Sequence, residues 1–128
     1  MKLLLDTHIV LWWLRDDPRL GHRTKALIAE AQAEILVSVA SFWELSIKAR
    51  NGKFAEPGSV LFAEAQRAGL MPLDVCAHHL VALEGIVAQP KHQDPFDHLI
   101  LAQAIAEDAL LVTNDRNLRR YGVRCFPA

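Results

Sequence analysis

Short apolar runs alternate with longer stretches of helical pattern along this chain, and the alternation predicts its fold. Strands fit the apolar runs at residues 2–5, 34–38, 70–73, 109–113 and 123–126. Helices fit the stretches between them, at residues 9–14, 21–32, 41–50, 59–68, 74–86 and 95–106, followed by a short turn through Leu118. Such alternation is typical of a parallel sheet covered on both faces. The pattern predicts an α/β fold with a small, mainly parallel five-stranded sheet flanked by helices, and Pro72 predicts an edge position for the third strand.

Composition places the chain among ordinary globular proteins. A length of 128 residues, 52% of them hydrophobic, fits a single domain over residues 1–128 that buries a core without disulfide bonds. The net charge of −1 gives no overall basic field, so a nucleic-acid partner would need a local patch. Cys76 and Cys125 lie in no metal or redox spacing. No apolar run could span a membrane, and Asp6 interrupts the start that a signal peptide would need, so we expect a cytoplasmic protein without a membrane partner.

The stretch over residues 92–104 places two carboxylates at the start of an apolar helix. Asp94 has the position of an N-cap, Pro95 that of the first helical residue, and Asp97 follows the cap by three residues. Two interpretations are open. Either Asp94 and Asp97 form a capping box that only starts the helix, or Asp97 points into a cleft and holds a metal ion.

Four acidic residues occupy positions that a parallel sheet brings to one edge. Asp6 closes the first strand, and Asp115 follows the fourth strand by two residues. Glu44 is expected in the first turn of the helix after the second strand, and Asp97 in the first turn of the helix before the fourth. Ligands of such sheets bind outside the carboxyl ends of the strands. We therefore expect these four carboxylates to converge there.

Each acid also has a structural interpretation. Asp6 can cap the first helix, Asp115 can cap the turn after it, and Ser41 with Glu44 has the spacing of a capping box. Asp74, which also follows a strand, is expected only to cap the next helix.

Several carboxylates in one cleft raise each other's pKa values unless a cation lies among them. Oxygen ligands without His or Cys favour a hard cation, Mg²⁺ or Mn²⁺. Such an ion suits phosphoryl chemistry, because it lowers the pKa of a bound water and stabilises charge on a phosphate oxygen. The hydroxyls of Thr7 and Thr113 are candidates to orient water or phosphate, or else to bond the backbone of the turns.

The remaining candidates have structural interpretations. We expect His8 and His98 to be exposed or structural, and His78 and His79 to be ordinary helix residues. The aromatic residues expected in the core are Trp12, Trp13, Phe42 and Trp43. Two basic clusters fit a solvated surface or, beside a metal cleft, a nucleic-acid contact: Lys48, Arg50 and Lys53, and Arg116, Arg119, Arg120 and Arg124.

Four short motifs give the chain a family resemblance. They are LLDTH (residues 4–8) with WW (12–13), SVASFWE (38–44), DPFDHLILAQA (94–104) and LVTND (111–115). In this order, and over essentially the whole chain, they resemble the PIN-domain ribonucleases, specifically the VapC-type toxins of type II toxin–antitoxin systems.

The resemblance implies a PIN-like fold with an acidic Mg²⁺ or Mn²⁺ site made of Asp6, Glu44, Asp97 and Asp115, and a supporting, capping role for Asp94. It implies a metal-dependent endoribonuclease that cleaves RNA phosphodiester bonds with a metal-activated water. It also implies a homodimer, and a cognate antitoxin protein that covers an apolar groove near residues 9–14 and 60–68. His98 departs from the pattern, because close relatives often carry arginine there.

Two other classes of function remain open from the residues alone. A metal-dependent phosphatase or DNA nuclease would use the same acids on a different substrate. An α/β binding module would use the carboxylates only as helix caps and would need no metal ion.

Overall fold

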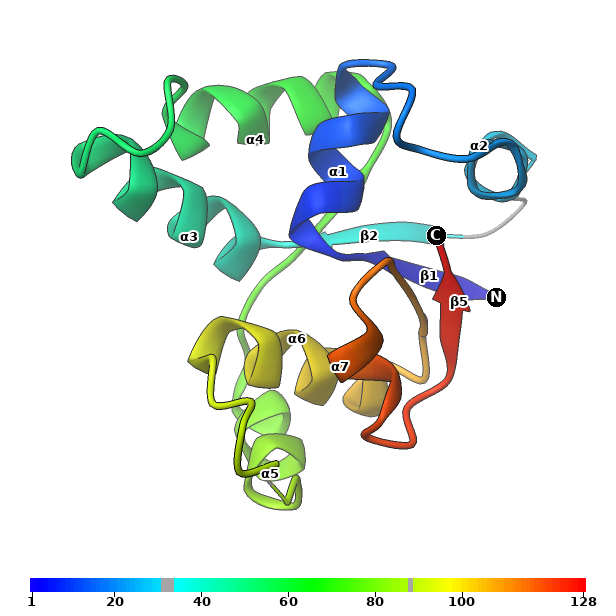
Figure 1. Cartoon of the computed structure of the whole chain (residues 1–128), viewed down its shortest axis with the longest axis vertical. Helices are drawn as coiled ribbons and strands as arrows, with labels where there is room; N and C mark the ends of the chain where they lie inside the picture. Colours follow the sequence, from blue (N-terminus) through cyan, green and yellow to red (C-terminus); the bar gives the residue numbers. More distant parts are fainter. Residues whose placement is uncertain (31–33, 88) are drawn as a thin grey trace.

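A five-stranded parallel sheet forms the centre of the computed structural model, which describes residues 1–30, 34–87 and 89–128 (Figure 1). The strands are β1 (Lys2–Leu5), β2 (Glu34–Ser38), β3 (Met71–Leu73), β4 (Leu110–Thr113) and β5 (Cys125–Pro127). Their order is β3-β2-β1-β4-β5, and all four pairings are parallel. The predicted α/β class is confirmed, as is the edge position of the strand that contains Pro72.

The described helices cover both faces of this sheet. They are α1 (Thr7–Leu14), α2 (His22–Ala29), α3 (Val39–Arg50), α4 (Gly58–Arg67), α5 (Ala77–Glu84), α6 (Pro95–Ala106) and α7 (Arg116–Arg119). Figure 1 shows α1, α2 and α4 on one side of the sheet, and α5, α6 and α7 on the other. None of the helices in the described residues has the length and apolar character needed to cross a membrane.

The central strand β1 supplies both cores. Leu3 and Leu5 belong to a cluster with residues of α1 and α4, whereas Leu4 belongs to a second cluster with residues of α6. All three leucines are fully buried, because alternate side chains of a strand point to opposite faces and both faces are covered here. This explains why β1 is a continuous apolar run rather than an alternating one.

The strand order reverses at β1. The chain runs from β1 outward to β2 and β3, and then returns to the other side of β1 for β4 and β5. A crevice at the carboxyl ends of the strands is expected at such a switch point. Asp6 follows β1 directly, and its backbone N–H donates to the carbonyl oxygen of Val112 in β4 at 3.0 Å. The first predicted site residue thus lies at the switch point.

At two helix starts the structure overturns a predicted capping role. Helix α3 begins at Val39, capped by Ser38, so Ser41 and Glu44 form no capping box and Glu44 lies in the second turn, not the first. Helix α5 begins at Ala77 with Cys76 as its N-cap residue, so the predicted capping role of Asp74 is wrong. The backbone N–H of Cys76 donates to Nδ1 of His79 in the first turn. The end of the helix predicted over residues 21–32 lies outside the described residues, which show α2 ending at Ala29.

Candidate metal centre

Two of the predicted acids follow neighbouring strands and are tied together by Thr113. Asp6 follows β1, and its Oδ1 accepts the backbone N–H of Thr7 at 2.8 Å. The Thr113 hydroxyl donates to Asp6 Oδ2 at 2.7 Å and accepts the backbone N–H of Asp115 at 3.0 Å. Asp115 in turn caps α7 by accepting the N–H of Asn117. Thr113 therefore holds the Asp6 carboxylate and the backbone of Asp115 at the switch point.

Glu44 approaches the same place from α3. The hydroxyl of Thr7 lies 3.3 Å from Glu44 Oε1 and 2.9 Å from the hydroxyl oxygen of Ser41. Lys48, one turn further along α3, places its Nζ 3.2 Å from Glu44 Oε2. Thr7 thus links the start of α1 to the acidic face of α3.

The start of α6 contributes the remaining acids. Asp94 caps the helix, with its Oδ1 accepting the N–H of Phe96 at 2.9 Å. Asp97 lies in the first helical turn, and its Oδ2 is 2.9 Å from Nε2 of His92. The cap is therefore made by the carboxylate of Asp94 itself, and Asp97 contacts a histidine from the preceding loop.

These side chains surround a cavity of about 220 Å³. Its lining residues are Asp6, Thr7, His8, Glu44, Lys48, Asp94, Asp97 and Asp115. The four predicted acids therefore meet in one place, together with Asp94 and Thr7, while Thr113 bonds to Asp6 and Asp115.

Burial makes negative charge costly at this cavity. Burial raises the pKa of Asp97 to about 6, with Asp94 and Asp6 adding to the increase and the hydrogen bond from His92 opposing it. Burial also raises the pKa of Asp6, against the hydrogen bonds from Thr113 and Thr7, and the charge of Asp115 adds to this increase. Carboxylates held together in this way gain from a cation placed among them.

The donor set fits a divalent cation. Asp6, Glu44, Asp97 and Asp115 offer carboxylate oxygens, the ligands that Mg²⁺ and Mn²⁺ prefer. Lys48 is the lysine of the cavity lining, and its ammonium group is already paired with Glu44. The negative charge of the remaining acids is therefore not balanced by Lys48, and the cavity is large enough to hold a metal ion.

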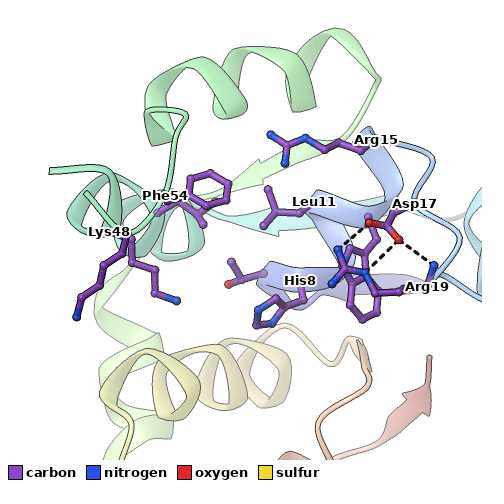
Figure 2. A pocket seen from close by; sticks show the side chains of 11 residues that line it. His8, Leu11, Arg15, Asp17, Arg19, Lys48 and Phe54 are labelled. Atoms are coloured by element: carbon purple, nitrogen blue, oxygen red, sulfur yellow. Dashed lines mark hydrogen bonds and ion pairs between the residues drawn. The ribbon is translucent and has the colours of Figure 1, made fainter. Parts of the chain in front are cut away.

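A second cavity of about 250 Å³ adjoins the first and shares Thr7, His8 and Lys48 with it. Figure 2 shows side chains from α1 and α3, and from the segments that follow them, gathered around it. Two arginines lie over aromatic rings, Arg19 at 5.1 Å from the Trp12 ring centroid and Arg15 at 5.8 Å from that of Phe54. Arg15 also pairs with Glu56, and Arg19 with Asp17 at 2.8 Å. This cavity is basic and aromatic where the first is acidic.

Several outcomes differ from the sequence prediction. Trp43, expected in the core, is 58% exposed and packs edge-on against Phe96 with ring centroids 5.0 Å apart. His79, expected to be an ordinary helix residue, is fully buried and bonds to Glu107 together with His78. His98 is structural, as expected, with its Nε2 3.0 Å from the carbonyl oxygen of His92.

The sequence prediction also missed a role for His92. This residue belongs to the stretch that drew attention to the acids, but it was expected only in a loop. Its Nδ1 lies 2.9 Å from the hydroxyl of Tyr121, which is 29 positions away in the chain. The sequence does place His92 only five residues before Asp97, and this spacing was the available signal. The contact of His92 with Tyr121 could not be predicted from the sequence.

Comparison with known proteins assigns this chain to a family. Residues 3–124 match the family model described as PIN domain. The chain belongs to the PIN-domain family. This PIN domain is 30% identical over 119 residues to Ribonuclease VapC22 of Mycobacterium tuberculosis, covering 93% of the chain and 91% of that relative.

Solved structures share the fold. The DNA-bound VapBC of Salmonella typhimurium superposes with a TM-score of 0.73 at 20% identity, covering 99% of this PIN domain and 98% of the matched chain. VapBC2 of Rickettsia felis, bound to a promoter DNA fragment, gives a TM-score of 0.69 at 20% identity with the same coverage. The 30% identity to Ribonuclease VapC22 confirms the expected resemblance to VapC-type PIN domains, and these structures agree with it in fold.

Proposed function

We propose that this PIN domain is a Mg²⁺- or Mn²⁺-dependent endoribonuclease that acts as the toxin of a toxin–antitoxin pair. The observation that carries the proposal is the convergence of Asp6, Glu44, Asp97 and Asp115 around one cavity at the switch point of the sheet. The name of the relative from Mycobacterium tuberculosis, a ribonuclease, supports RNA as the substrate.

The residues around the cavity have separable roles in this proposal. A divalent cation held by the four carboxylates supplies a Lewis acid that activates water and stabilises charge on the scissile phosphate. Thr113 holds Asp6 and Asp115 in place through its hydroxyl, and Thr7 does the same for Glu44. Lys48 lines both cavities, so it is the lysine assigned to contact a phosphate oxygen of a substrate that spans them.

The second cavity supports a single-stranded nucleic acid as the substrate. Four basic residues line it, Arg15, Arg19, Lys48 and Lys53, and together they offer positive charge for a phosphate backbone. The net charge of −1 meant that a nucleic-acid partner would need a local basic patch, and the second cavity provides one.

An antitoxin partner is part of the proposal. The Salmonella typhimurium and Rickettsia felis structures are named as VapBC complexes, which supports a protein partner for this chain. A largely apolar groove of about 240 Å³ between α3 and α4 offers a surface for it, beside the exposed Trp43. Of the two segments expected to form the antitoxin groove, residues 60–68 contribute Phe62 to its lining and residues 9–14 contribute none of the lining residues. The cognate antitoxin is its proposed occupant. Pairing of two copies of the chain is proposed on the family resemblance.

The direct test is RNA cleavage by the wild type and by Asp97→Asn in the presence of Mn²⁺. Loss of this ligand should lower the cleavage rate by more than roughly a hundredfold, because even partners that only orient a metal ligand are worth roughly 10- to 100-fold. Asp74→Asn is the matched control, an exposed acid after β3 that lies outside the cavity, and it should cleave at the wild-type rate.

Three substrates separate the proposed activity from its alternatives. RNA, DNA and a simple phosphate ester are offered to the same preparation. Cleavage of RNA alone supports the endoribonuclease, whereas preference for DNA or for the ester would replace it. A folded Asp97→Asn protein with full RNA cleavage would refute the assigned site.

A further inference from the structure

We propose that His92 is a nitrogen ligand of the cation, completing the site together with Asp97 and Asp115 and favouring Mn²⁺ over Mg²⁺. The inference rests on the proposed function, because it concerns the same cavity. It adds a ligand that the carboxylate motifs do not contain.

The geometry of the three side chains is that of a shared ligand set. One ligand atom from each of His92, Asp97 and Asp115 lies within 4.8 Å of the other two. His92 Nε2 and Asp97 Oδ2 are 2.9 Å apart. Two neighbouring ligands about 2.1 Å from an octahedral metal ion are separated by about 3.0 Å, so this pair needs little movement to bind one.

His92 is held by contacts typical of a metal-binding histidine. Its side chain is 11% exposed, and its second ring nitrogen, Nδ1, lies 2.9 Å from the Tyr121 hydroxyl. Tyr121 is itself held by the backbone N–H of Gln89 at 3.2 Å and by His98 Nε2 at 3.2 Å. Metal-ligating histidines commonly donate their other ring N–H to an oxygen in this way, which fixes the direction of the ring.

The Tyr121 hydroxyl also leaves the proton of His92 free to change place. Without a cation, the phenol donates to Nδ1, and the Nε2–H of His92 donates to Asp97. With a cation at Nε2, the Nδ1–H of His92 donates to the phenol oxygen. The phenol proton then turns to the carbonyl oxygen of His92, which lies 3.2 Å away. Because a hydroxyl both donates and accepts, each state keeps its hydrogen bonds satisfied.

The other cluster with the composition of a metal site lacks this freedom. His78, His79 and Glu107 also bring three ligand atoms within 4.8 Å of one another. However, His79 Nδ1 accepts the backbone N–H of Cys76 at 2.9 Å, and a backbone N–H can only donate. In neutral His79 the proton must therefore sit on Nε2, where it points at Glu107 instead of leaving a lone pair for a metal ion. The contrast selects His92 as the metal ligand.

A nitrogen ligand changes which ion the cavity prefers. Mg²⁺ is bound almost entirely through oxygen ligands, whereas an imidazole nitrogen also suits divalent transition metals. Among the first-row divalent transition metals, Mn²⁺ gains the least affinity from such a ligand. The expected preference for Mn²⁺ over Mg²⁺ is therefore moderate, and it depends on His92.

Pulsed electron paramagnetic resonance of the Mn²⁺-loaded full chain tests the assignment. The wild type should show ¹⁴N hyperfine coupling from a directly bound imidazole. His92→Gln should lose the coupling, and its Mn²⁺ affinity should fall by roughly tenfold or more while its Mg²⁺ affinity changes less. His8→Gln is the matched control, because His8 is the histidine in the cavity lining, and it should keep the coupling.

A second variant keeps the proposal testable if His92→Gln folds poorly. Tyr121→Phe retains the imidazole and removes its partner, so the coupling should persist while Mn²⁺ binds more weakly. Wild type that binds Mn²⁺ without ¹⁴N coupling, or a folded His92→Gln that keeps it, would overturn the role of His92 and leave the carboxylate site standing. Folded wild type that binds no Mn²⁺ would overturn the proposed function as well.

Discussion

The two ends of α6 carry clusters of the same residue types in opposite electrostatic states. At the amino end, Asp97 faces His92 near Asp115, Asp6 and Asp94, and burial raises the pKa of Asp97 to about 6. Beyond the carboxyl end, Glu107 accepts hydrogen bonds from His78, His79 and Lys2, which hold its pKa down to about 2. Histidine beside a carboxylate is therefore no sign of a metal site by itself.

Charge balance and donor direction separate the two clusters. Glu107 is one carboxylate with three side-chain partners, Lys2, His78 and His79, so it is satisfied by the chain itself. The cavity at the other end gathers five acids with Lys48 and two histidines in reach, so it holds surplus negative charge. We interpret the Glu107 cluster as a structural contact that holds α5 and β1 against the end of α6. We interpret the Asp97 cluster as the metal centre.

The largest expected effect on stability is at the Glu107 cluster. His79 is fully buried, and His79→Ala leaves a cavity and removes the partner of the Cys76 N–H and of Glu107. It should lower the free energy of unfolding by about 3 kcal/mol, measured by urea denaturation. Mn²⁺ affinity of the folded variant should be unchanged.

His78→Ala provides the control for this comparison. His78 bonds to the same carboxylate, but its side chain is 58% exposed, so its removal should cost less than about 1 kcal/mol. Equal losses of unfolding free energy in the two variants would contradict the structural role assigned to buried His79. Loss of Mn²⁺ binding in His79→Ala would contradict the assignment of the metal site to the Asp97 cluster alone.

The dependence of stability on pH should have opposite signs at the two ends. Glu107 has a lowered pKa, so it stabilises the fold above its ordinary value of 4.5 and loses this effect as the pH falls toward 2. Asp97 has a raised pKa, so its contribution is present below 3.8 and is lost as the pH rises through about 6.

Two amide variants measure these contributions in metal-free protein. Glu107→Gln should lower the free energy of unfolding at neutral pH, and the difference from wild type should shrink in acid. Asp97→Asn should raise it at neutral pH, with a difference that also shrinks in acid. Chemical denaturation across this pH range checks the sign of both effects. If the two variants shift the free energy of unfolding in the same direction at neutral pH, the proposed difference in electrostatics between the two clusters is contradicted.

Local patterns were enough to predict the sheet and the acids. The leucines of β1 form an apolar run because both faces of the strand are covered, and Asp6 and Asp115 follow strands whose carboxyl ends share an edge. The positions of these residues therefore follow from strand geometry. Glu44 was placed one turn too early, because Ser38 and not Ser41 caps α3.

The histidine partners could not be predicted in the same way. His79 reaches Glu107 across 28 positions, and His92 reaches Tyr121 across 29, so each contact depends on how helices and loops pack. Trp43 was expected in the core because large aromatic side chains are more often buried than used to stack bases, but its position on α3 faces the apolar groove and solvent. Periodicity gives the side of a helix, and it does not say whether another element covers that side.

Calorimetric titration of Mn²⁺ into the wild type, Asp97→Asn and the control Asp74→Asn tests the central claim most directly, because it needs no knowledge of the RNA target. The account predicts binding to the wild type and to Asp74→Asn, and its loss in Asp97→Asn. A folded wild type that binds no Mn²⁺, or an Asp97→Asn variant that binds it as tightly as the wild type, would contradict the assignment of the acidic cavity as a metal centre.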